Sequence, residues 1–113
     1  IGSNANIENS MISEGSSIDG TVDFSVIFSG VTIEKGATVN YSIVMPGSVI
    51  KAGAVVEYAI IGEDCVIESD AKIGTSPENI ENRDEWGIAV VGHNVTVSKG
   101  KFVEPKQIIA DNI

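Results

Sequence analysis

Ile and Val recur along this chain at intervals of five and six residues. Three blocks of equal length carry the pattern without a gap: 21–37, 38–54 and 55–71. An alternating strand would repeat every second residue, so the spacing argues against an ordinary β-sandwich. Repeats of this kind stack as coils around a shared core. The aliphatic positions of the blocks are Val22, Ile27, Ile33, Val39, Val44, Ile50, Val56, Ile61, Ile67 and the following Ile73.

Two further columns share the same register. Three residues after an aliphatic position, in the longer units, lies Gly, Asn or Asp, as at Gly30, Gly47 and Asp64. These residue types accept the left-handed backbone of a tight corner. A small residue follows, such as Ala54 or Cys65. This hexapeptide pattern predicts an all-β fold, a single-stranded left-handed parallel β-helix of about six coils, spaced about 4.8 Å apart.

The pattern extends beyond the blocks in both directions. It runs backwards through Ile18, Ile12 and Ile7, and it resumes as Val91, Val97, Val103 and Ile109. We therefore expect one β-helix domain over residues 1–113. Between 73 and 91 the repeat lapses into a segment with Pro77, several acidic residues and the only Trp. That segment is predicted to leave the prism as a loop, with Trp86 folding back as an anchor over the core.

Large apolar side chains also occupy positions that should point outward. Aromatic residues stand in one column, and aliphatic residues and Met stand in the columns beside it. Stacked aromatics on neighbouring strands stabilise each other modestly. A contiguous outward apolar stripe is more typical of a docking surface for another domain or subunit. The predicted stripe consists of Phe24, Val26, Phe28, Tyr41, Ile43, Met45, Tyr58 and Ile60.

Charge and composition exclude several classes of function. The formal charge is 7 − 16 = −9, which argues against nucleic acid and anionic membranes as partners. No apolar run approaches the roughly 20 residues of a membrane-spanning helix. One Cys and one His cannot form a common structural zinc site, and no metal site is predicted. The single Cys excludes an internal disulfide and fits a reducing cytoplasm, and Cys65 is expected to be an inert core thiol.

Several motifs resemble one enzyme family. The units FSVIF and YSIVM, the segment IIGEDCVIESDAKIG and the return DEWGIAVVGHN are similar to the C-terminal domain of glucose-1-phosphate adenylyltransferase, or ADP-glucose pyrophosphorylase. The resemblance implies a cytoplasmic nucleotidyltransferase of glycogen or starch synthesis, which makes ADP-glucose and pyrophosphate from ATP and glucose 1-phosphate. It places ATP and Mg²⁺ in an N-terminal catalytic domain that is absent from this fragment. No catalytic residue is therefore expected here, and the fragment alone is expected to be inactive.

The resemblance also implies partners for this domain. They are the protein's own catalytic domain, further copies in a homotetramer, and a phosphorylated metabolite that acts as an allosteric effector. Basic side chains would read the phosphate. The candidates are His93, which stands where the family has Arg, and the nearby Lys99 and Lys101. Glu63 occupies a position where some members carry Arg, and a carboxylate there would repel phosphate.

Two other assignments stay open from the sequence. One is a hexapeptide acyltransferase, in which a trimer interface supplies a catalytic His and binds acyl-coenzyme A. His93 is a poor match, because it is expected outside the regular coils and no long loop is expected to leave the middle of the prism. The other is a non-catalytic paralogue of the adenylyltransferase. A hexapeptide carbonic anhydrase needs three His ligands and is excluded by the single His.

Overall fold

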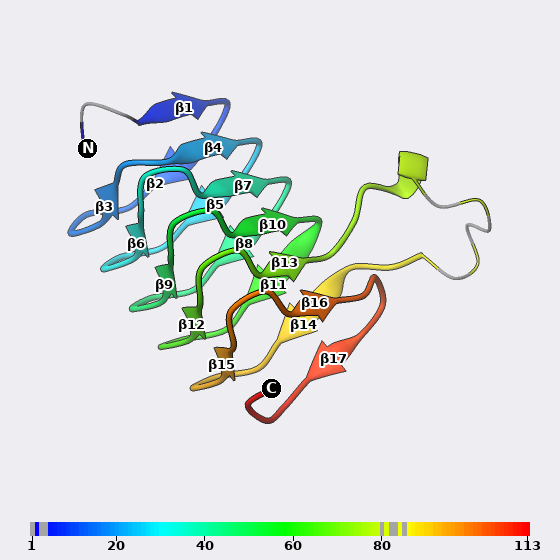
Figure 1. Cartoon of the computed structure of the whole chain (residues 1–113). Coiled ribbons are helices and arrows are strands. Elements are labelled where there is room, and N and C mark those ends of the chain that lie inside the picture. Colours follow the sequence, from blue (N-terminus) through cyan, green and yellow to red (C-terminus); the bar gives the residue numbers. More distant parts are fainter. Residues whose placement is uncertain (1, 3–4, 80, 82–83, 85) are drawn as a thin grey trace.

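The chain winds into a triangular prism of parallel strands (Figure 1). The structure is a computed structural model that describes residues 2, 5–79, 81, 84 and 86–113. Sheet A contains β1 (Asn6–Glu8), β4 (Thr21–Asp23), β7 (Thr38–Asn40), β10 (Val55–Glu57), β13 (Lys72–Ile73) and β16 (Phe102–Val103). Sheet B contains β2 (Met11–Ile12), β5 (Val26–Ile27), β8 (Ile43–Val44), β11 (Ala59–Ile61), β14 (Ala89–Val91) and β17 (Ile108–Ile109). Sheet C contains β3 (Ser17–Ile18), β6 (Thr32–Ile33), β9 (Val49–Ile50), β12 (Val66–Ile67) and β15 (Thr96–Val97).

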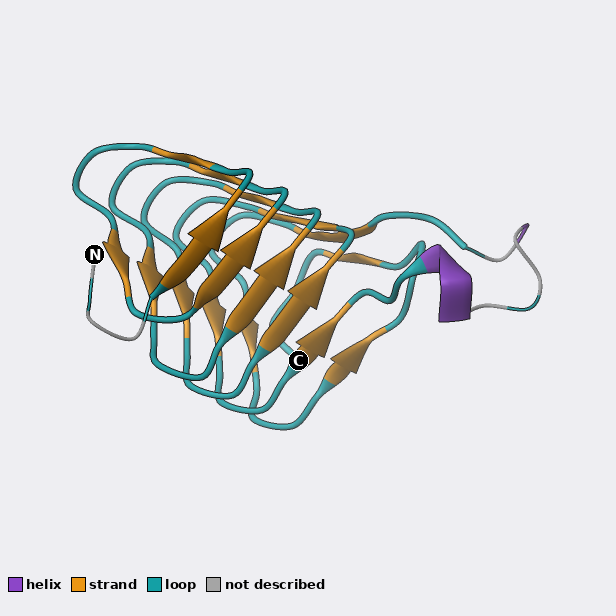
Figure 2. Ribbon diagram, turned by 90° about the horizontal axis from the view of Figure 1, so that it is seen from above, coloured by secondary structure: helices purple, strands orange, loops and turns teal. Residues whose placement is uncertain are grey.

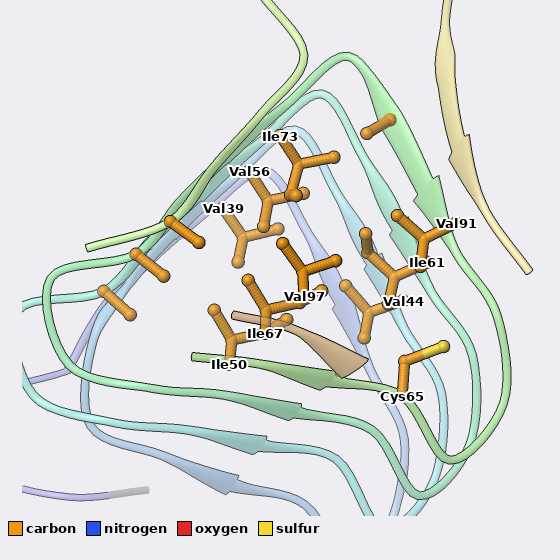
Figure 3. Close-up of a cluster of buried hydrophobic side chains, with 14 of the residues drawn as sticks. Val39, Val44, Ile50, Val56, Ile61, Cys65, Ile67, Ile73, Val91 and Val97 are labelled. Carbon is orange, nitrogen blue, oxygen red and sulfur yellow. The ribbon is translucent and has the colours of Figure 1, made fainter. Parts of the chain in front are cut away.

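Each strand pairs in parallel with the equivalent strand of the next coil. Val22 lies beside Val39, and Val39 lies beside Val56. The repeat therefore places identical positions in vertical columns, and three columns of Ile and Val point into the prism (Figure 3). Sheets of 6, 6 and 5 strands confirm the predicted all-β, left-handed parallel β-helix of about six coils.

The corners use the predicted left-handed backbone. Gly30 and Gly47 have φ values of 70° and 79°, and Asp64 has a φ of 53°. The corner between sheets A and B differs from the prediction. There Phe24 and Tyr41, with φ values of 46° and 49°, adopt the same conformation. Aromatic residues rarely occupy this region, because the Cβ approaches the following carbonyl oxygen.

Buried serine hydroxyls join successive coils at this corner. The Ser25 hydroxyl accepts the N–H of Ser42 at 3.1 Å, and the Ser42 hydroxyl accepts the N–H of Ala59 at 3.2 Å. Each hydroxyl also donates to a carbonyl two residues earlier in the chain, that of Asp23 or Asn40. Small residues here therefore satisfy buried backbone groups as well as fitting a narrow interior.

The predicted excursion leaves the prism after β13 and returns at β14 (Figure 2). It begins with the 3₁₀ turn η1 (Pro77–Asn79). Trp86 anchors its return, because the indole N–H donates to the carbonyl of Thr75 at 2.6 Å. The prediction that this indole covers the core is wrong. Its ring lies edge-on to Tyr58, at the outer corner of the prism, with ring centroids 5.6 Å apart.

Candidate functional site

The outer side of sheet B is apolar on every strand. One residue of each strand points outward, and the parallel register places these residues in a single row, which we call the sheet B row. Ile43 at 37 %, Met11 at 72 % and Ile108 at 73 % exposure are the most accessible members. The outer positions of sheets A and C are mostly Thr, Ser, Asn and charged residues. The sheet B row consists of Met11, Val26, Ile43, Ile60, Val90 and Ile108.

An aromatic ladder borders this row at the corner between sheets A and B. The rings of Phe24 and Tyr41 stack with centroids 4.9 Å apart, and those of Tyr41 and Tyr58 with centroids 4.7 Å apart. Left-handed backbone costs about 1–2 kcal/mol per residue, whereas an aromatic pair contributes about 0.5–1.5 kcal/mol. The stacking energy of the two ring pairs therefore does not exceed the backbone strain at the three aromatic residues of the ladder. Strained backbone of this kind gathers at functional positions.

Phe28 and Met45 border the row on its other side. All eight residues of the predicted stripe thus form one surface, which we call the apolar face together with Met11, Val90 and Ile108. The sequence-based prediction of the stripe did not include Val90 and Ile108, because the excursion interrupts the regular spacing that would have aligned them with Ile60. The backbone register restores that alignment by pairing Ile60 with Val90.

The three predicted effector residues lie at two different corners. His93 occupies the corner after β14, where its Nδ1 accepts the N–H of Glu63 at 2.8 Å. Lys99 and Lys101 follow β15, at the corner between sheets C and A. The expectation that His93 lies outside the regular coils is wrong, because the next residue, Asn94, turns an ordinary left-handed corner with a φ of 58°. Effector binding by these three residues stays a prediction.

A small cavity lies beside the aromatic ladder, where the excursion leaves the prism. Its volume is about 210 Å³, and its lining includes Tyr41, Tyr58, Glu57, Ser76 and Glu78. Ligand pockets for drug-sized molecules usually measure about 300–1,000 Å³. The cavity therefore suits one side chain rather than a coenzyme.

Cys65 is a core thiol. It is fully buried, and its Sγ donates to the carbonyl of Gly92 at 2.8 Å. Burial raises the pKa of the thiol, although neighbouring hydrogen bonds oppose this shift. A thiol that stays protonated is a poor nucleophile, as expected for a structural cysteine.

No group of three His, Cys, Asp or Glu side chains gathers into a possible metal site within the described residues. The resemblance to the adenylyltransferase family implied Mg²⁺ in a separate catalytic domain, and that assignment stays a prediction. No helix in the described part of the chain is long and apolar enough to cross a membrane.

Residues 2–97 match the family described as GlmU-like, C-terminal hexapeptide. The chain belongs to this family. No curated protein matches the sequence. Among solved structures, this GlmU-like hexapeptide chain is similar to the acetyltransferase domain of PglB from Neisseria gonorrhoeae FA1090, at 23% identity and a TM-score of 0.76, over 96% of this chain. The same domain in complex with acetyl coenzyme A matches at 22% identity and a TM-score of 0.70, over 90% of this chain.

The GlmU-like chain spans 49% of the length of each of these acetyltransferase chains. At this identity the likeness extends to the fold, a hexapeptide β-helix of the kind found in acetyltransferases. The comparisons lend no support to the resemblance to glucose-1-phosphate adenylyltransferase, or to the role in glycogen synthesis, the formation of ADP-glucose and the allosteric control that this resemblance implies.

Proposed function

We propose that this chain is the β-helix domain of a transferase. In that protein it binds and positions a neighbouring domain or subunit through the apolar face. The single observation that carries the proposal is the sheet B row, which continues without a polar residue from β2 to β17. Monomeric proteins rarely expose a contiguous apolar surface of this kind. Homotetramer formation and a cytoplasmic location belong to the same proposal.

Two transfer chemistries compete for the parent protein. Acyl transfer is the one that the comparisons favour, because the two structures described above are acetyltransferase domains and one holds acetyl coenzyme A. Adenylyl transfer to glucose 1-phosphate is favoured by the sequence motifs alone, and it places the chemistry in another domain. A regulatory paralogue of that enzyme would use the β-helix in the same way.

The geometry of His93 bears on the acyl-transfer candidate. A catalytic His must present an unprotonated ring nitrogen to the acyl acceptor. In this chain Nδ1 accepts the N–H of Glu63, so a neutral imidazole carries its proton on Nε2 and offers a donor there. A single copy therefore holds His93 in the wrong arrangement for a general base.

Docking is tested in the full-length protein with the double substitution Ile43→Asp and Ile60→Asp. Both residues are central in the sheet B row, so we expect the assembly to dissociate in light scattering. The matched control is Val49→Asp with Val66→Asp, on paired strands of the outer face of sheet C. Assembly that survives the sheet B substitutions as well as it survives the control would exclude docking through this face.

The chemistry is tested separately, with the wild-type chain and His93→Ala. If the protein transfers acyl groups and a neighbouring copy frees Nδ1 of His93 to act as the base, the chain should bind acetyl coenzyme A in calorimetry, and acetyl transfer should fall at least about 100-fold in the variant, the scale of general base catalysis. Absence of both binding and turnover would favour a parent enzyme whose active site lies in another domain.

A further inference from the structure

Charge is unevenly distributed over the three corners of the prism. The corner between sheets C and A is balanced, and one of its lysines, Lys51, pairs with Glu68 at 3.3 Å. The other two corners border the apolar face, and they are acidic. Corner C–A holds Lys35, Lys51, Lys99 and Lys101 beside Asp19, Glu34, Glu68 and Asp70. Corner A–B holds Glu8, Asp23, Glu57, Glu104 and Lys106, and corner B–C and its continuation after β17 hold Glu14, Glu63, Asp64, Asp111 and His93.

The few basic groups near the acidic corners already have partners in the described part of the chain. The ammonium of Lys106 donates to the carbonyl of Asp84 at 3.0 Å. Lys72, on the outer side of sheet A, lies 3.9 Å from the Glu57 carboxylate. His93 accepts a backbone N–H through Nδ1. Both long edges of the apolar face therefore present mainly carboxylates to whatever covers it.

This pattern selects among possible occupants. A second copy packed face to face on the same surface would bring acidic edge against acidic edge. Like charges placed together across an interface disfavour that pairing, whereas a partner of opposite charge is steered toward it. Long Lys and Arg side chains can lay their apolar stems along such an edge and still reach the carboxylates. The occupant that fits is apolar at its centre and basic along both sides.

The dimensions of the sheet B row indicate the form of this occupant. Neighbouring strands lie about 4.8 Å apart, so the five intervals from Met11 to Ile108 cover about 24 Å. An amphipathic helix carries its apolar stripe in steps of three and four residues, which advance about 5.3 Å on average. A helix of about 16 residues, aligned with the prism axis, would match the row with little loss of register.

We propose that the apolar face binds an amphipathic helix whose apolar stripe covers the sheet B row and whose flanking Lys and Arg residues meet the acidic corners. This inference rests on the proposed docking function and names the chemistry of the docked partner. The aromatic ladder borders the helix-binding surface on one side, and Phe28 and Met45 border it on the other.

The test uses the full chain and two fluorescent peptides of 18 residues. Both carry the same Leu stripe at helical spacing, flanked by Lys in one peptide and by Glu in the other. In fluorescence anisotropy we expect the Lys peptide to bind, and its Kd to rise at least tenfold between low salt and 0.3 M salt. The Glu peptide should bind at least 100-fold more weakly. Glu14→Gln with Glu63→Gln should weaken the Lys peptide several-fold and flatten the salt dependence.

Ile43→Asp with Ile60→Asp should abolish peptide binding, and Val49→Asp with Val66→Asp should preserve it, with circular dichroism confirming that both variants fold. Equal binding of the two peptides, no binding of either, or binding that survives the sheet B substitutions would overturn the inference. A dimer of this chain alone that dissociates on Ile43→Asp would identify a second copy of the β-helix as the occupant of the apolar face, and it would also overturn the inference. In each of these cases, dissociation of the full-length assembly by the sheet B substitutions would still support docking as such.

Discussion

At the scale of single residues, the corners of this fold depend on contacts that one coil makes with the next. Gly74 is an example, because a Cβ at this position would overlap the carbonyl oxygen of Glu57 in the coil before it. Gly100 has a similar φ, 73° against 77° for Gly74, but has no atom within 4 Å of an added Cβ. Both glycines have a left-handed backbone, but only Gly74 lies close to an atom of the neighbouring coil.

This difference predicts unequal costs for two alanine substitutions. Gly100→Ala should lower the free energy of unfolding by about 1–2 kcal/mol, the cost of left-handed backbone. Gly74→Ala should cost about 1–3 kcal/mol more, because the neighbouring coil must move to accept the methyl group. Chemical denaturation followed by circular dichroism measures both values. Equal costs would show that backbone strain alone matters at these corners.

The serine hydroxyls make a second residue-scale contribution. Ser42→Ala should lower the free energy of unfolding by about 1–3 kcal/mol, since it leaves the buried N–H of Ala59 without an acceptor. Ser29 is exposed on the surface, so Ser29→Ala should change stability by less than about 0.5 kcal/mol. Thermal unfolding of the two variants compares them directly, and a shift of equal size would refute a role for the buried hydroxyl.

At the scale of elements, the Trp86 indole helps to hold the excursion between β13 and β14 to the prism, together with the Lys106 ammonium, which donates to the carbonyl of Asp84. Trp86 meets Tyr58 edge-on and donates to the carbonyl of Thr75. The same contact closes one end of the aromatic ladder, while Phe24 and Tyr41 stay 49 % exposed. Docking at the apolar face and the position of the excursion are therefore physically linked.

Replacement of this side chain should release the excursion without unfolding the coils. Trp86→Ala removes the ring contact and the hydrogen bond, so hydrogen exchange and proteolytic cleavage within 76–88 should accelerate at least tenfold. Trp86→Phe keeps a ring and should show an intermediate effect. Protection of β9 and β12 serves as the internal control. A variant with unchanged exchange in the excursion would show that other contacts hold this segment.

At the scale of the whole molecule, the prism is a one-dimensional array in which each coil contacts only its neighbours. Contacts between repeats, rather than distant contacts, should then set the stability. Residues 38–54 make one complete coil, in which Val39 pairs with Val22 before it and Val56 after it. The ends of this segment are equivalent positions of adjacent coils.

Deletion of residues 38–54 should therefore leave a folded, shorter prism. Val22 would then pair with Val56, and Phe24 would stack on Tyr58, because the inward and outward positions stay aligned. We expect a β-type circular dichroism spectrum and a cooperative transition at a lower Tm. Deletion of 38–45 removes neither a whole coil nor a whole side and should abolish that transition, since it would bring Tyr58 and Asp64 to inward positions that Ile50 and Val56 occupy in the intact chain. Equal behaviour of the two deletions would refute the array description.

The periodic part of the sequence determined most of the fold by itself. The Ile and Val spacing predicted the inner columns, the Gly and Asp positions predicted most corners, and Phe24, Tyr41 and Tyr58 were correctly placed outside. These features recur in each coil, so each coil supplies the same evidence for the inward, outward and corner positions. The role of Ser42 was not predictable, because its partners lie one coil away and two residues back.

Only the tertiary structure decided what the outer surface looks like as a whole. Val90 and Ile108 join the sheet B row because strand pairing across the excursion brings them there, which no fixed spacing reveals. The acidic corners likewise arise from residues far apart in the chain that the winding aligns. The sequence by itself determined a β-helix with an outward apolar stripe. The stacking of its coils decided that the stripe runs the full length of one sheet between two acidic edges, because the position of an outer column depends on long-range register.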